Sequence, residues 1–201
     1  MSLLSRIRKL TVIAGVFSAV LSLSGCGINN IPTYKQQVTA AWSQVLNEYQ
    51  RRTDLIPNLV ATVKGYAAHE TKVLVAVTQA RSKVTQTRIP ADILTNPAEF
   101  RKFEQNQATL GGALSRLMAV TENYPNLKAD QNFLMLQAQL EGTENRIAVA
   151  RRDYILAVQQ YDTELTTIPG RWYHSLFYSN YQPVQNFTIS AASMQTPQVK
   201  F

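Results

Sequence analysis

The sequence predicts an all-α protein, an antiparallel up-down bundle of three to four long helices with coiled-coil-like packing. Apolar residues recur at intervals of three and four through most of residues 34–168, which is the spacing of one helix face. Glycine and proline are sparse over this range, so few positions can end a helix. Because short links make neighbouring helices run up and down, we expect this range to form one bundle that buries its apolar stripes together.

The first apolar stripe predicts one long helix from Tyr34 to Val84. Its other members are Val38, Trp42, Val45, Tyr49, Ile56, Leu59, Val63, Tyr66, Val73 and Val77. Pro57 lies inside this range, and a proline within a helix removes one hydrogen bond and clashes with the carbonyl four residues before it. The stripe keeps its phase across Pro57, which favours a kink in a continuous helix. A break after Thr53 is the alternative, and a sharp bend at Pro57 would make the bundle one of four helices.

The second helix is predicted to begin at Asn96-Pro97-Ala98-Glu99, which supplies an N-cap, a first-turn proline and a capping-box acid. Its stripe consists of Phe100, Phe103, Gln107, Leu110, Leu114, Leu117 and Tyr124. Pro125 ends it. The glycine pair Gly111-Gly112 in the middle predicts that another helix packs tightly against this point.

The third helix is expected after a short turn at residues 125–129. Its stripe consists of Phe133, Leu136, Leu140, Ile147, Ala150, Tyr154, Val158, Tyr161 and Leu165. Pro169-Gly170 ends it. The remaining segment, residues 169–201, starts with aromatic residues that predict a short docked helix and continues from Gln182 with polar residues that predict a mobile C-terminal tail.

Residues 1–25 have the pattern of a lipoprotein signal peptide. Three basic residues come first: Arg6, Arg8 and Lys9. The lipobox comes last: Leu23, Ser24 and Gly25, followed by the only cysteine, Cys26. The apolar run between them would rise about 21 Å as a helix, which is short of a bilayer core of roughly 30 Å. We expect cleavage before Cys26, acylation of that residue, for example with palmitate, and a lipidated tether over residues 26–33; an uncleaved N-terminal membrane helix is the alternative.

This signal predicts a bacterial cell-envelope protein that is held at a membrane by the acylated Cys26, with its bundle extracytoplasmic, in the periplasm. Gly27, in place of an aspartate, favours the outer membrane over the inner membrane. The chain carries 20 Lys and Arg against 13 Asp and Glu, and three of the basic residues lie in the predicted signal. The remaining positive charge is scattered rather than clustered, so no nucleic-acid partner is predicted.

Several short motifs resemble the conserved blocks of the LemA family. They are Ala41-Trp42-Ser43-Gln44, Arg51-Arg52, Asp54-Leu55-Ile56-Pro57-Asn58-Leu59-Val60, Val63-Lys64-Gly65-Tyr66, His69-Glu70, Ala80-Arg81, the stretch from Leu136 to Ile147, Ala150-Arg151 and Pro197-Gln198-Val199-Lys200-Phe201. The resemblance implies a membrane-tethered antiparallel helical bundle outside the cytoplasm, and it implies no particular reaction. The chain departs from the family in its lipobox, where many members have a plain membrane helix, and over residues 46–50.

Few residues suggest chemistry. His69-Glu70 begins a His-Glu-x-x-His zinc pattern, but Val73 stands where the second histidine would be, so no metal site is predicted. Glu70 is instead expected to face the bundle and to pair with a cation of a neighbouring helix. The candidates are Arg81, Arg146 and Arg151.

Glu141 and Glu144 lie one helical turn apart, as an acid and base pair could. Structural ion pairing is favoured, with Glu144 and Arg151 two turns apart on the same face. We therefore predict no catalytic residue and no cofactor.

The best site candidate is the cluster Arg51, Arg52 and Asp54, which precedes Pro57. It could bind an acidic headgroup or a partner segment. The favoured interpretation is that it stabilises the kink, with Arg51 or Arg52 binding the carbonyl near Thr53 that the proline leaves free.

Together these features predict a non-catalytic scaffold or adaptor with a protein partner of unknown identity. An envelope enzyme acting on lipid or cell-wall material, or a bundle that carries or senses a lipid, is the alternative.

Overall fold

A computed structural model describes residues 27–187, and over this range the chain forms six helices and no strand. The helices are α2 (Asn30–Tyr66), α3 (Thr71–Gln86), α4 (Pro97–Thr121), α5 (Pro125–Lys128), α6 (Gln131–Thr166) and α7 (Gly170–Phe177). The all-α prediction is confirmed. The predicted signal peptide, its lipobox, Cys26 and residues 188–201 lie outside the described residues.

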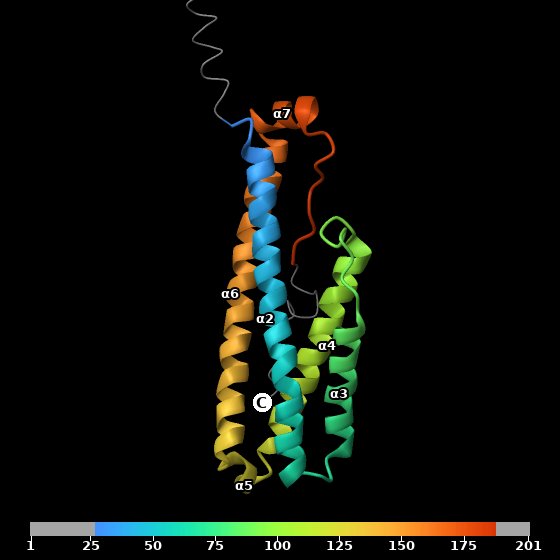
Figure 1. Cartoon of the computed structure of the whole chain (residues 1–201), viewed down its shortest axis with the longest axis vertical. Coiled ribbons are helices and arrows are strands. Elements are labelled where there is room, and N and C mark those ends of the chain that lie inside the picture. The colour runs from blue at the N-terminus through green and yellow to red at the C-terminus, as the bar shows by residue number, and fades with distance from the viewer. Residues whose placement is uncertain (1–26, 188–201) are drawn as a thin grey trace, which may run out of the picture.

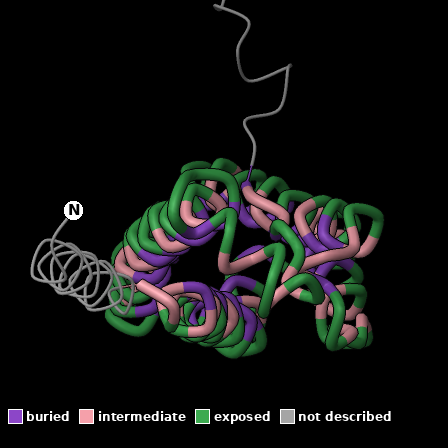
Figure 2. The backbone as a smooth tube through the Cα atoms, turned by 90° about the horizontal axis from the view of Figure 1, so that it is seen from above, coloured by how far each residue is buried: buried purple, intermediate pink, exposed green. Residues whose placement is uncertain are grey.

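Two long helices and a shorter hairpin make up the bundle (Figure 1). α2 and α6 run antiparallel and pack along their length, while α3 and α4 form a hairpin that lies beside α2 from its lower end past its middle and leaves its upper end uncovered. α5 closes one end, and α7 lies across the other end, where the described chain begins. Seen along the bundle axis, the buried positions face the interior and the exposed positions face outward (Figure 2).

The predicted stripes of α4 and α6 supply much of the core. Every stripe member from Phe133 to Leu165 in α6 is buried. α4 begins where it was predicted, because the Asn96 side chain accepts hydrogen bonds from the backbone N–H groups of Ala98 and Glu99. Asp130 caps α6 in the same way through the N–H of Phe133.

The helix containing Pro57 is continuous, as predicted, but it ends at Tyr66, so the expected single rod to Val84 is wrong. The chain reverses over residues 67–70, where the N–H of Ala67 bonds the carbonyl of Val63 and the N–H of Glu70 bonds that of Ala67. The apolar stripe is weak at this point, since Tyr66 is 45% exposed. Reversal lets buried residues of α3 face the lower core together with residues 56–63 of α2. The fourth long helix therefore arises from this turn and not from a bend at Pro57.

The two ends of the bundle also differ from expectation. Residues 30–33 belong to α2, and Ile31 is fully buried, so the predicted tether does not extend through them. Residues 182–187 were expected in a mobile tail, but Val184 and Phe187 are buried in the upper core. This segment descends between α2 and α4, beside the part of α2 and α6 that extends past the hairpin (Figure 1). Apolar side chains there would otherwise face water.

The glycine pair of α4 does not mark a tight helix contact, which corrects that prediction. A Cβ atom at Gly112 would meet nothing within 4 Å. At Gly111 it would meet only Nη1 of Arg52, at 3.8 Å. The short aromatic helix, in contrast, is confirmed as α7. None of the described helices has both the length and the apolar character required to cross a bilayer.

Candidate functional site

A buried arginine joins three helices near the middle of the bundle. Arg52 projects from α2, and its side chain is only 5% exposed. Its Nη1 donates to Oε1 of Glu144 on α6 at 3.0 Å, and its Nη2 donates to the side chain and the backbone carbonyl of Gln107 on α4, at 2.6 and 3.2 Å. The guanidinium lies 5.0 Å from the ring centre of Tyr49. A planar guanidinium with five donors suits such a three-way junction.

A second ion pair lies beside the first. Arg146 of α6 donates from Nε to Oε2 of Glu48 on α2 at 3.1 Å, and from Nη2 to the hydroxyl of Thr143 at 2.9 Å. The Glu48 side chain is 10% exposed, and its Oε1 also accepts a hydrogen bond from Gln44 at 3.1 Å. The two pairs form a polar layer across the interface of α2 and α6, which we call the arginine layer: Arg52, Glu144, Arg146 and Glu48.

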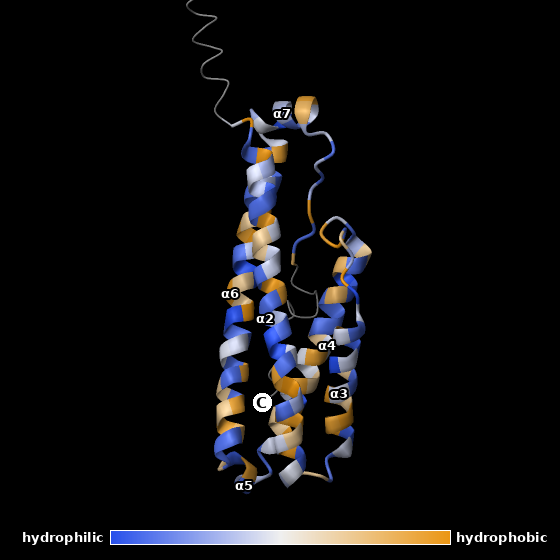
Figure 3. Cartoon of the chain, viewed as in Figure 1, coloured by the Kyte–Doolittle hydropathy of each residue, from blue (hydrophilic) through white to orange (hydrophobic). Residues whose placement is uncertain are grey.

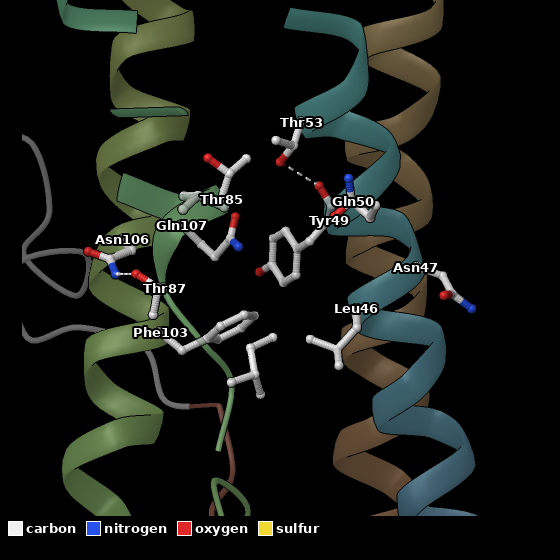
Figure 4. Close-up of a pocket in the computed structure, with 12 residues that line it drawn as sticks. Leu46, Asn47, Tyr49, Gln50, Thr53, Thr85, Thr87, Phe103, Asn106 and Gln107 are labelled. Atoms are coloured by element: carbon white, nitrogen blue, oxygen red, sulfur yellow. Dashed lines mark hydrogen bonds between the residues drawn. The ribbon is translucent and has the colours of Figure 1, made fainter. Parts of the chain in front are cut away.

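A cleft of about 370 Å³ opens beside the arginine layer, between α2 and the α3–α4 hairpin (Figure 4). Tyr49, Phe103 and Gln107 line it, together with hydroxyl and amide side chains such as Asn106. Burial raises the pKa of the Tyr49 phenol, so its hydroxyl stays protonated at neutral pH. The cleft therefore offers apolar surface and neutral hydrogen-bonding groups.

The cluster predicted near Pro57 is split by the structure. Arg51 and Asp54 lie on the exposed face of α2, where Asp54 accepts a 2.7 Å hydrogen bond from Gln50. Arg52 points into the core, because side chains one residue apart on a helix diverge. The three residues therefore do not form one site.

The carbonyl of Thr53 does receive an arginine, but from another helix. Nε of Arg81 on α3 donates to it at 3.2 Å, which corrects the expectation that Arg51 or Arg52 would do so. Arg81 thus contacts a backbone carbonyl of α2 and not the expected Glu70.

The remaining predicted polar residues also have partners other than those expected. Oε1 of Glu70 accepts a 3.0 Å hydrogen bond from the hydroxyl of Tyr124. Glu144 pairs with Arg52 and not with Arg151, whose guanidinium lies 4.4 Å from the ring centre of Phe187. His69 is exposed, and among residues 27–187 no three His, Asp or Glu side chains gather to hold a metal ion.

Sequence reasoning missed Glu48 and the role of Gln107. Both carried a signal: each is a polar residue at helical spacing within an otherwise apolar stripe. A polar side chain at such a position needs a buried partner. Spacing along one helix could not identify that partner, because the two residues can be far apart in the sequence: Arg52 and Gln107 are 55 residues apart.

These features define an all-helical bundle protein whose buried charges are paired across its helices. The LemA family model matches residues 41–201, and the chain belongs to the LemA family. It is similar to magnetosome proteins MamQ 2 and MamQ 1 of Paramagnetospirillum magneticum (strain ATCC 700264 / AMB-1), each 26% identical over 190 residues, which cover 85% of this chain and 69% of the relative. It is also similar to magnetosome protein MamQ of Magnetospirillum gryphiswaldense, with 28% identity over 92 residues, 44% of this chain and 33% of the relative. None of these names is that of an enzyme.

Proposed function

We propose that this chain is a lipid-anchored, extracytoplasmic scaffold or adaptor of the bacterial cell envelope, without a catalytic role. The observation that carries the proposal is the engagement of the arginine layer. Its four charged side chains bind one another or a glutamine and join α2, α4 and α6. Charged groups committed to holding helices together are poorly placed to bind and turn over a substrate.

The anchor part of the proposal is supported by sequence position. The lipobox ends at Cys26, and the described bundle begins with α2 at Asn30. An acyl group on Cys26 would therefore hold the bundle end that bears α7 near the membrane, with the outer membrane favoured by Gly27. The far end, formed by α5 and the turn at residues 67–70, would then project away from it toward a partner protein.

Metabolic labelling with radioactive palmitate tests the anchor. Cells expressing the full chain should yield a labelled band in the membrane fraction, and Cys26→Ser should abolish both the label and membrane retention. Arg51→Ser serves as the matched control, because Arg51 is exposed and lies on the bundle. A Cys26→Ser protein that stays labelled or membrane-bound through another segment contradicts the lipid anchor.

Crosslinking in intact cells tests the scaffold role. The wild-type protein should capture the same partner in repeated pull-downs, and Cys26→Ser should lose it through mislocalisation. A reproducibly empty pull-down from correctly localised protein contradicts the proposal.

The cleft beside Tyr49 favours one second candidate, a bundle that binds a small apolar ligand or an acyl chain. Its volume is within the range of small-molecule sites, and Phe103 gives it an apolar wall. Native mass spectrometry of the purified protein should then show a co-purified ligand that Phe103→Asp removes. Ligand-free protein from cells argues against this candidate.

A further inference from the structure

Helix α7 carries several large apolar side chains that are mostly exposed. Trp172, Leu176 and Phe177 are 59%, 74% and 63% exposed, and Ile168, just before the helix, is 65% exposed. Figure 3 shows that α7 lies at the tip of the molecule and that part of it is strongly hydrophobic. Single exposed apolar residues are common, but a cluster of this kind marks a contact surface.

The helix is held in this exposed position by specific contacts. Gly170 packs against the backbone carbonyl of Glu164, so closely that any Cβ atom there would overlap it. Nε2 of the His174 ring lies 2.8 Å from the carbonyl oxygen of Tyr181. The exposed side chains are thus presented by a fixed element.

α7 lies at the end of the bundle where the described chain begins. A Cβ atom at Gly27 would lie 3.7 Å from the ring of Tyr173, so α7 touches the first described residue of the chain. Asn30 also donates to Glu164 at 3.2 Å, which ties the start of α2 to the end of α6. Consecutive Cα atoms are about 3.8 Å apart, so a lipid on Cys26 would be attached within one residue of this contact.

We propose that α7 lies in the interface of the phospholipid layer that holds the acyl anchor, with Trp172, Leu176 and Phe177 inserted at headgroup level. The inference rests on the proposed anchor. An indole with an apolar body and a polar N–H suits this depth, as do aliphatic and phenyl groups beside it. α7 contains Arg171 and no Asp or Glu, so no carboxylate opposes contact with anionic headgroups. The contact provides a second membrane signal, which fixes the bundle against the surface.

Tryptophan fluorescence can test this contact, because the chain has two tryptophans in different environments. Trp42 is 5% exposed and lies about 18 Å along α2 from Asn30. The acylated full chain is reconstituted into phosphatidylethanolamine and phosphatidylglycerol vesicles, with and without lipids brominated near the headgroup. We expect brominated lipid to quench the wild-type emission, and Trp172→Ser to lose this quenching while its remaining emission from Trp42 is unchanged.

A matched pair of variants separates the surface from general hydrophobicity. Leu176→Ser with Phe177→Ser should reduce the quenching of Trp172, whereas Leu134→Ser with Met135→Ser, also exposed but at the far end of α6, should leave it unchanged. Circular dichroism confirms that each variant is folded. If the protein floats with the vesicles and Trp172 is not quenched, α7 faces a protein or water and the inference is wrong while the anchor stands. If the protein does not float, the anchor and the inference fall together.

Discussion

Arg81 of α3 donates from Nε to the carbonyl oxygen of Thr53 in α2, which is the carbonyl that Pro57 leaves without its usual donor. Thr53 is 1% exposed, so water has little access to this carbonyl. A helix after the reversal thus completes the hydrogen bonding of the helix before it. The hydrogen bond from Arg81 thus compensates the backbone donor that Pro57 lacks.

Replacing Arg81 should destabilise the bundle, because the carbonyl of Thr53 loses its hydrogen-bond donor. We expect Arg81→Met to lower the free energy of unfolding by about 1–3 kcal/mol, since a buried acceptor loses its partner. Urea unfolding followed by circular dichroism measures this. In a Pro57→Ala background the loss should be smaller, because the alanine N–H can bind the same carbonyl. Equal losses in both backgrounds would contradict the pairing.

The arginine layer predicts an asymmetry between the partners of one ion pair. Arg52→Met should cost about 1–3 kcal/mol, because Gln107 is left unsatisfied in the core. Glu144→Gln should cost only about 0–1 kcal/mol, since the Glu144 side chain is 45% exposed and water can replace part of the interaction. Arg52→Lys is the control: a lysine keeps the charge without the planar fork and should recover only part of the stability. Full recovery by lysine would show that geometry is unimportant.

The last described segment should contribute to stability like a core element. Phe187 is 8% exposed and packs with Trp42, Phe100 and Tyr154, with ring centres 5.2–6.2 Å apart. We expect Phe187→Ala to cost about 3–5 kcal/mol in urea unfolding. Pro183→Ala, at an exposed position of the same segment, should be nearly neutral. If Phe187→Ala left the free energy of unfolding unchanged, the result would contradict the docking of this segment and favour the mobile tail that its composition predicts.

Two glycines should respond to alanine in opposite directions. Gly112→Ala places a methyl group in open space within a helix, so it should raise the free energy of unfolding by about 0.5–1 kcal/mol. Gly170→Ala would force a methyl group into the Glu164 carbonyl and should displace α7. Thermal unfolding and the emission of Trp172 report the two effects. If Gly112→Ala destabilised the protein, the result would favour the tight helix contact that the sequence predicted at this glycine.

Alkaline pH should weaken the upper core through Tyr161. Burial, with Asp162 and Tyr181 nearby, raises its pKa to about 12 from an ordinary value of 10.0, and its hydroxyl donates to the carbonyl of Gln182. The folded state therefore holds this proton more tightly, and the stability that it contributes is complete below pH 10 and lost as pH rises toward 12. Urea unfolding across this range should show less pH dependence in Tyr161→Phe. An unchanged slope would assign the loss to other groups, such as Tyr154, whose pKa burial also raises.

Features within single helices, such as caps and apolar stripes, predicted most of the helices of this fold. They did not predict the contacts between residues that are far apart in the sequence. The caps at Asn96 and Asp130, and the stripes behind them, depend on neighbours within one helix. The reversal over residues 67–70 contains neither proline nor glycine, so the periodicity of the sequence extended the predicted helix through it. The docking of Phe187 is decided by aromatic partners far away in the sequence.

The candidate site shows the same division. Spacing marked Glu144 and Arg146 as candidates for polar pairing, but it placed Arg52 at the Pro57 kink. It assigned partners within a helix or by charge, whereas Arg52 and Glu144 are 92 residues apart. The lipobox is a linear motif whose outcome depends on processing enzymes, so its test is biochemical.

The pairing of α2 with α6 has a consequence for how the chain folds. The α3–α4 hairpin joins consecutive helices and can form from local contacts, whereas the apolar face of α2 finds its main partner only after residues 131–166 have emerged. A chain delivered amino terminus first therefore holds an unfinished core until α6 has emerged. Assembly of this bundle is thus a late event, and any helper that shields the first helix must remain bound until then.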